Sequence, residues 1–307
     1  MILCCGEALI DCLPRKCVDG ADVFQPVNGG SVYNTAIALG RLGHDVGLFA
    51  GMSTDFFGDN LREGLKASHV SHQYLRTKAL HTTLALVKLD DGHARYSFID
   101  DASAGRMLGK ADLPKLPSSV TALHFGSISL IPEPCGSTYE TLMKRNAKSK
   151  VICLDPNIRP TLIKDKKKHI ARLHRLIAMA DIVKISDEDV KWMTGADDLA
   201  KAAKGFLRKG AKLVAITRGG NGCAVFSKAF SFTADAPKVK VADTVGAGDT
   251  FTAGMLFYLS THKLLNKKAI AALSEDQIRS AVTYAMRAAA ITVSRPGADP
   301  PWAFEMQ

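Results

Sequence analysis

The sequence predicts an α/β protein with a mostly parallel central sheet and a small separate β-sheet beside it. Three observations carry this prediction: short apolar runs recur along the chain, amphipathic stretches separate them, and two other segments, one polar and extended and one alternating apolar and polar residues, break this pattern. Strands buried on both faces consist of continuous apolar runs. The first two observations therefore indicate a parallel sheet with helices on both sides.

The core strands and helices follow in order along the chain. The apolar runs predict six strands, at Met1–Leu9, Asp45–Ala50, Ala122–Phe125, Val151–Leu154, Ile182–Ile185 and Leu213–Thr217. The segments between them predict six helices, at Tyr33–Leu42, Asn60–Ala67, Thr138–Ala147, Ile170–Ala178, Asp187–Met193 and Leu199–Arg208. Two further helices are expected at Gly248–Ser260 and Asp276–Val293, where the apolar residues recur with helical spacing.

Two stretches break this rhythm and predict the second sheet. Residues 12–27 are polar and extended, and residues 82–99 alternate on either side of Asp91-Gly92, a dipeptide typical of tight hairpins. We therefore expect a discontinuous β lid made of residues 12–27 and 82–99. The core would consist of residues 1–11, 28–81 and 100–307. A small sheet over the edge of an α/β core can act as a lid.

Composition excludes several classes of protein. The 307 residues are 47% hydrophobic and 23% charged, which excludes a disordered chain, a collagen-like fibre and a coiled coil. No apolar run approaches the ~18 residues of a membrane span, and no basic segment precedes the apolar N-terminus as in a signal peptide. The seven cysteines form no CxxC pair, which favours reduced thiols in a cytoplasmic protein.

The net charge of +10 raises the question of an anionic partner. The densest basic run, residues 164–169 with Arg172 and Arg175 beyond it, has no interleaved aromatic residues. It is predicted to be a solvated helix face, because single-stranded nucleic acids need such aromatic stacking platforms. We expect neither a nucleic-acid nor a membrane partner, although a general positive field helps to attract anionic substrates such as nucleotides.

The strongest chemical pattern is Gly246-Ala247-Gly248-Asp249, a turn of small residues that opens a predicted helix. Backbone N–H groups at a helix start can bind an anion. A carboxylate at the rim of that site suits a base that takes the proton of a hydroxyl group, while the N–H groups stabilise charge on a transferred group. An acidic residue in a first turn is also common by itself, but that alternative leaves the two glycines unexplained.

A second pattern is Gly29-Gly30 before the helix that contains Asn34. The Asn34 amide can both donate and accept hydrogen bonds, which suits a polyhydroxylated ligand. Asp11 is expected to end the first strand, where open α/β sheets place ligand-binding groups. Neither a Walker P-loop nor a GxGxxG turn occurs after the first strand.

On these two motifs the chain resembles the ribokinase-like sugar kinases, the PfkB family. The segment from Gly29 to Gly43 is similar to the family's N-terminal motif, and Asp243–Asp249 is similar to its C-terminal one. The resemblance covers the whole chain. It implies a three-layer α/β/α sandwich with a β lid, and ATP-dependent phosphorylation of a hydroxymethyl group.

The resemblance also implies roles for single residues. It makes Asp249 the catalytic base, and Gly246, Ala247 and Gly248 its anion hole. The implied sugar-binding residues are Asp11, Gly29, Gly30, Asn34 and Arg159. The implied ATP-binding residues are Ser186, Thr217, Gly219, Gly220, Gly222, Met286 and Ala289, of which Met286 and Ala289 fit equally well as core residues of an amphipathic helix.

Two metal sites are implied in the same way. The family often carries Asn-x-x-Glu for magnesium, whereas this chain has Ser186-Asp187-Glu188-Asp189. Its oxygen ligands, Asp189 among them, suit Mg²⁺ held largely through water. A K⁺ site would use backbone carbonyl groups near Asp243, Val245, Arg295 and Gly297.

Within the family, residues 6–11, 125–130 and 155–159 resemble bacterial-type fructokinases. The expected reaction is therefore phosphorylation of fructose to fructose 6-phosphate. The alternatives are a 2-keto-3-deoxygluconate kinase, which would need an extra cation from Arg95, Arg106 or Arg159, and a catalytically silent sensor of sugar and nucleotide. A homodimer formed through the lid is a further expectation from the resemblance.

Overall fold

The computed structural model describes the backbone of residues 1–90 and 93–307, with side chains except at positions 89, 90 and 93–95. The expected turn at Asp91-Gly92 and the side chain of Arg95 lie outside the described residues. An eight-stranded sheet forms the centre, in the order β14-β13-β12-β11-β10-β9-β1-β4. The strands are β1 (Ile2–Cys5), β4 (Val46–Phe49), β9 (Ala122–Gly126), β10 (Val151–Asp155), β11 (Ile182–Ser186), β12 (Leu213–Thr217), β13 (Cys223–Ser227) and β14 (Ser231–Ala234).

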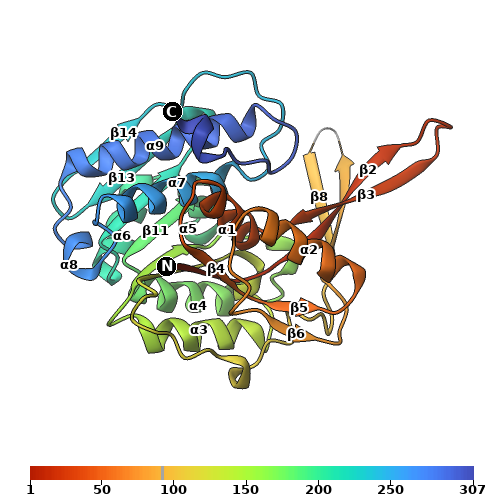
Figure 1. Ribbon diagram of the computed structural model, residues 1–307. Coiled ribbons are helices and arrows are strands. Elements are labelled where there is room, and N and C mark those ends of the chain that lie inside the picture. Colours follow the sequence, from red (N-terminus) through yellow and green to blue (C-terminus); the bar gives the residue numbers. More distant parts are fainter. Residues whose placement is uncertain (91–92) are drawn as a thin grey trace.

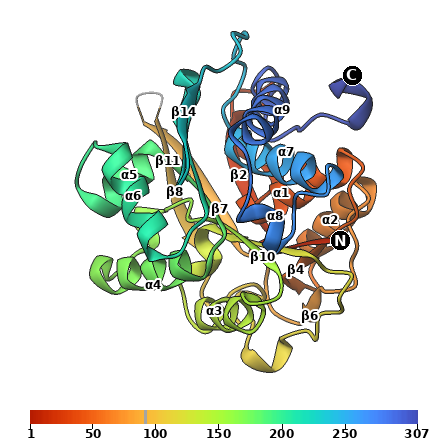
Figure 2. The same cartoon turned by 90° about the vertical axis from the view of Figure 1, so that its left-hand side faces the viewer.

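Helices cover both faces of this sheet (Figures 1 and 2). Ile2 and Cys4 of β1 pack into one core, and Leu3 and Cys5 pack into the other, as expected for a strand buried on both sides. The first core holds α1 (Ser31–Arg41), α2 (Phe56–Ala67), α7 (Ala247–Thr261), α8 (Lys267–Ile270) and α9 (Glu275–Val293). The second holds α3 (Cys135–Asn146), α4 (Lys166–Met179), α5 (Asp187–Thr194) and α6 (Leu199–Lys209).

A four-stranded sheet stands beside this core, in the order β3-β2-β7-β8. It joins β2 (Leu9–Lys16) and β3 (Asp22–Gly29) to β7 (Leu84–Asp90) and β8 (His93–Ile99), two segments that are far apart in sequence. In Figure 1 the β2–β3 hairpin projects away from the body of the molecule. A short third sheet pairs β5 (Gly51–Ser53) with β6 (Arg76–Lys78). The predicted class, a mostly parallel sheet between helices plus a small separate sheet, is confirmed.

The first strand differs from the prediction. A single strand over Met1–Leu9 is wrong, because β1 ends at Cys5 and Leu9 already begins β2. The Glu7 carbonyl accepts a hydrogen bond from the Tyr33 N–H of α1, so the chain leaves the central sheet at this point. Asp11 therefore lies in the small sheet and does not end the first core strand.

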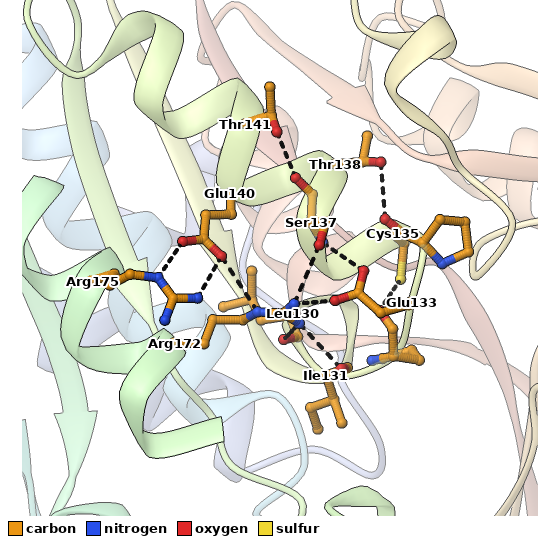
Figure 3. A network of polar contacts seen from close by, with 12 residues as sticks. Leu130, Ile131, Glu133, Cys135, Ser137, Thr138, Glu140, Thr141, Arg172 and Arg175 are labelled. Atoms are coloured by element: carbon orange, nitrogen blue, oxygen red, sulfur yellow. Dashed lines mark hydrogen bonds and ion pairs between the residues drawn. The ribbon is translucent and has the colours of Figure 1, made fainter. Parts of the chain in front are cut away.

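The basic segment at the start of α4 is only partly a solvated face. Lys166–Lys168 are exposed, but Arg172 is only 8% exposed, so the prediction for this residue is wrong. Its guanidinium donates to the carbonyl oxygens of Leu130 and Ile131 and pairs with the carboxylates of Glu133 and Glu140 (Figure 3). These contacts tie α4 to the loop before α3 and to α3 itself.

Two expectations based on composition can be compared with the structure. All seven cysteines are free thiols, and each of them except Cys17 is buried. Among the described residues, no helix is long and apolar enough to cross a membrane.

Candidate active site

A cavity of about 480 Å³ lies between the central sheet and the small sheet. Tyr96 and Phe98 of β8 line one side, and the ends of the core strands and the first turns of α1 and α7 line the other. Ligands of open α/β sheets bind at this carboxyl edge. The cavity brings together eleven of the residues singled out from the sequence, namely Asp11, Gly30, Asn34, Arg159, Ser186, Asp189, Thr217, Val245, Gly246, Gly248 and Asp249.

The Asp249 carboxylate joins the two helix starts. It lies in the first turn of α7, and the residue is 6% exposed. Its Oδ1 accepts a hydrogen bond from the Ser31 hydroxyl at 2.6 Å, and its Oδ2 accepts one from the Asn34 amide at 3.0 Å. Burial raises the pKa of Asp249 above its ordinary value, while these two donors and the Lys184 ammonium oppose the rise. A carboxylate whose pKa is raised in this way takes up a proton more readily than an exposed aspartate does, which suits a general base.

The turn before α7 needs its glycines. Gly246 has φ +76°, and a Cβ there would lie 2.7 Å from the Ala298 Cβ. The Ala247 N–H donates to the Thr244 carbonyl at 3.4 Å. Within the described residues, the N–H groups of Gly248 and Asp249 donate no hydrogen bond, so these two are the groups best placed to bind an anion.

Asp11 and the paired glycines form another wall. A Cβ on Gly29 would lie 2.1 Å from Asp11 Oδ2, so a side chain at this position would displace the carboxylate. Gly30 is the N-cap of α1 and has φ +101°. Burial raises the pKa of Asp11 to about 6, and the nearby Arg159 guanidinium opposes the rise. The Arg159 guanidinium donates to Asn157 Oδ1 at 2.5 Å and also lines the cavity.

Ser186 and Asp189 lie at the start of α5. The Ser186 hydroxyl caps the helix by accepting a hydrogen bond from the Asp189 N–H at 3.1 Å. The Asp189 carboxylate in turn accepts the Ile158 N–H at 3.1 Å. Burial and the neighbouring Asp155 carboxylate raise the pKa of Asp189 to about 6. A cation bound near the Asp155 and Asp189 carboxylates would relieve the repulsion between them.

The other candidates for ATP binding, Gly219, Gly220, Gly222, Met286 and Ala289, lie outside the cavity lining. Thr217 ends β12, and the turn after it holds Gly219 at φ +52° and Gly222 at φ +79°, with open space around Gly219 and Gly220. Met286 is buried in the first core, and Ala289 is partly buried against that core. The structure thus places both residues of α9 where the core-packing alternative expected them.

The loops around Asp243 and Gly297 are fastened together. Asp243 Oδ1 accepts the Val245 N–H at 3.0 Å, and Oδ2 accepts the Gly297 N–H at 2.9 Å. The Arg295 side chain pairs with Glu305 and Asp299. The backbones of both loops therefore lie side by side, as a site built from main-chain carbonyl groups would need.

Sequence reasoning gave no role of their own to four polar residues of this region: Ser31, Glu7, Lys184 and Asp155. Glu7 Oε1 accepts the Val32 N–H at 3.3 Å, while its buried Oε2 has no partner within the described residues. Burial raises the pKa of Glu7 to about 7. Glu7 and Lys184 each interrupt an apolar run, a signal that could have identified both of them.

A carboxylate beside N–H groups at a helix start, in a cavity at the carboxyl edge of a parallel sheet, is an arrangement that suits a phosphotransferase. The chain belongs to the pfkB family of carbohydrate kinases, whose family model matches residues 1–303. A fructokinase of Rhizobium leguminosarum bv. trifolii is 51% identical over 280 residues, covering 91% of this chain and 86% of that protein. A probable fructokinase-7 of Arabidopsis thaliana is 32% identical, over 98% of this chain and 89% of its own length.

Solved structures show the same architecture. A fructokinase from Xylella fastidiosa with bound ATP has a TM-score of 0.91 and 27% identity, covering 99% of this chain and 96% of that one. A double mutant of fructokinase from Vibrio cholerae O395, in a form with fructose, ADP and potassium ion bound, has a TM-score of 0.85 and 26% identity, covering 97% of this chain and 93% of that one. The ribokinase-like fold class is thereby confirmed.

Proposed function

We propose that this protein is an ATP-dependent fructokinase that transfers the γ-phosphoryl group to the primary hydroxyl at C6 of fructose. The observation that carries the proposal is the Asp249 carboxylate, buried in the cavity beside N–H groups at the start of α7 that donate to no described residue. The 51% identity to a fructokinase supports the choice of sugar.

In the proposed mechanism, Asp249 accepts the proton of the sugar hydroxyl as that oxygen attacks the γ-phosphorus. Ser31 and Asn34 hold the carboxylate in place through both of its oxygens. The N–H groups of Gly248 and Asp249 stabilise charge on the transferred group. Asp11 accepts hydrogen bonds from sugar hydroxyls on the opposite wall, and the turn at Gly219–Gly222 contacts the nucleotide phosphates.

The residues near Asp189 fit a magnesium ion. Asp155 Oδ1 is buried and accepts no hydrogen bond from the described residues, and the Asp189 carboxylate lies close enough to repel it. In the described part of the chain, no cluster of three or more His, Cys, Asp or Glu side chains forms a complete metal site. The two carboxylates, Asp155 and Asp189, therefore suit Mg²⁺ that would be held mainly through water and nucleotide, where it would neutralise phosphate charge. Asp189 would hold it, with Ser186 beside it.

The small sheet supports the proposed lid. Residues 12–27 and 82–99 would move as a unit over the core of residues 1–11, 28–81 and 100–307, and β8 already contributes Tyr96 and Phe98 to the cavity wall. Closure would exclude water, which competes with the sugar as acceptor. The hairpin exposes Val18 and Phe24, which supports a homodimer formed through the lid.

Two further assignments belong to this proposal. A potassium ion would be held by main-chain carbonyl groups of the loops that Asp243 fastens together, near Val245, Arg295 and Gly297. The buried free thiols support a cytoplasmic enzyme, where thiols stay reduced.

A screen of ADP release with fructose, 2-keto-3-deoxygluconate, glucose, ribose and adenosine tests the function. Fructose should give the largest kcat/KM, because a site that hydrogen-bonds specific hydroxyls can reject analogues lacking them by about 10⁴. A preference for 2-keto-3-deoxygluconate would identify that sugar acid as the substrate, with Arg159 as the cation that pairs with its carboxylate. Binding of sugar and ATP without turnover would favour a sensor. Phosphorus NMR of the product locates the phosphate, and a C1 product would contradict the C6 assignment.

A further inference from the structure

We propose that Lys184 is a catalytic residue whose ammonium group contacts the transferred phosphoryl group, and that Asp155 is the positioning residue that aims it. This inference rests on the proposed kinase function and adds a residue to it. It starts from an unusual placement: Lys184 interrupts the buried strand β11, and its side chain is only 6% exposed. Charged side chains are rarely buried to this extent unless paired.

The ammonium group has one close partner and a defined direction. Lys184 Nζ lies 2.9 Å from Asp155 Oδ2, at the end of the neighbouring strand β10. A Cβ built on Gly248 would lie 2.7 Å from the same Nζ. The cation is therefore fixed against the first turn of α7, beside the N–H groups proposed to bind the transferred group.

The charges around the cavity show why a cation is needed here. Of the described residues that line the cavity, five are carboxylates, and only Lys184 and Arg159 carry a permanent positive charge. Burial acts to lower the pKa of Lys184, but the carboxylates of Asp155, Asp249 and Asp189 outweigh it, so the pKa is raised. The lysine stays protonated in the site that must accept a polyanionic nucleotide.

During transfer, the bond between the γ-phosphorus and the β,γ-bridging oxygen breaks, and its electron pair leaves on ADP. The bond between the sugar oxygen and phosphorus forms, and the hydroxyl proton passes to Asp249. Lys184 keeps its proton throughout. Its positive charge stabilises negative charge on the non-bridging oxygens of the transferred group, which a preorganised cation does without reorganisation.

Because Lys184 also neutralises Asp155, a purely structural role must be separated from a catalytic one. The test compares Lys184→Met with the double variant Lys184→Met/Asp155→Asn, which removes both charges while keeping similar side-chain volumes. The single variant leaves the Asp155 carboxylate buried without its partner and should melt at a lower temperature. The double variant should recover much of that loss.

The readouts are kcat, KM for fructose, ADP affinity by calorimetry, and melting temperature. We expect kcat to fall about 10²–10³-fold in both variants, while ADP, which lacks the transferred group, binds within a few fold of the wild type. Recovery of kcat together with stability in the double variant would overturn the proposal, as would near-normal kcat in the single variant. A wild-type protein that turns over no sugar would instead contradict the proposed function itself.

Discussion

Substitution of Asp249 by asparagine separates a catalytic base from a helix cap. Asparagine keeps the size of the side chain and removes its ability to take a proton at neutral pH. If Asp249 accepts the sugar proton, kcat should fall by about 10²–10⁴. Nucleotide affinity should change little, because the N–H groups at the start of α7 remain.

The structure also gives the expected cost in stability. The asparagine carbonyl oxygen can accept from the Asn34 amide, and its own amide can donate to the Ser31 hydroxyl, which rotates to accept it. Both hydrogen bonds of Asp249 are thereby replaced. The free energy of unfolding should change by about 1 kcal/mol or less, so a large loss of kcat cannot arise from misfolding.

The assay is ADP release at saturating fructose and ATP, with urea unfolding of the same preparation. Asp198→Asn is the matched control, since Asp198 caps α6 through the Lys201 N–H and is exposed, away from the cavity. The control should keep its kcat. If Asp249→Asn turns over fructose at more than a tenth of the wild-type rate, the carboxylate is not the base.

Three other perturbations have expected outcomes. Gly248→Val should lower kcat about 10²–10³-fold by crowding the anion site. Gly205→Val on α6, where a Cβ would meet only Arg208 Nη2 at 4.0 Å among the described residues, should not; equal rates would remove the phosphate-binding assignment. The folded protein holds the Glu7 proton more tightly than the unfolded chain, so stability from this group should be lost as pH rises from about 4.5 to about 7. In urea unfolding, Glu7→Gln should remove roughly 3 kcal/mol of the change in stability between these pH values. An unchanged dependence of stability on pH would refute the raised pKa of Glu7. Arg172→Met should cost about 2–4 kcal/mol of stability at unchanged kcat, against at most about 1 kcal/mol for the more exposed Arg175→Met; equal costs would contradict the role of burial.

The sequence identified the positions where the backbone itself is special. Gly246 and Gly30 have positive φ, and Gly29 leaves room for the Asp11 carboxylate. Such needs restrict the residue type locally, so they leave a motif that can be read without a structure. The alternation of strands and helices is visible for the same reason, since burial on both faces shows as continuous apolar runs.

Pairings between distant side chains leave no such trace. Ser31 and Asp249 are 218 positions apart, and nothing near either residue in the sequence points to the other. The split of the first predicted strand is of the same kind, because the Glu7 carbonyl is taken by the Tyr33 N–H of a helix that only tertiary packing brings there. Arg172 was misjudged because its partners, in the loop before α3 and in α3 itself, are more than 30 positions away in the sequence (Figure 3).

Buried charge is the intermediate case. Glu7 and Lys184 stand out in the sequence only as charged residues within apolar runs, which shows that something must compensate them but not what. The structure supplies the partner for Lys184, the Asp155 carboxylate, and leaves one oxygen of Glu7 without any among the described residues. Burying a charged group costs free energy because the group loses its hydration. A buried ion pair therefore seldom stabilises the fold more than a well-packed apolar pair would. Both side chains line the cavity where phosphoryl transfer is proposed, so function is the stronger reason for their presence.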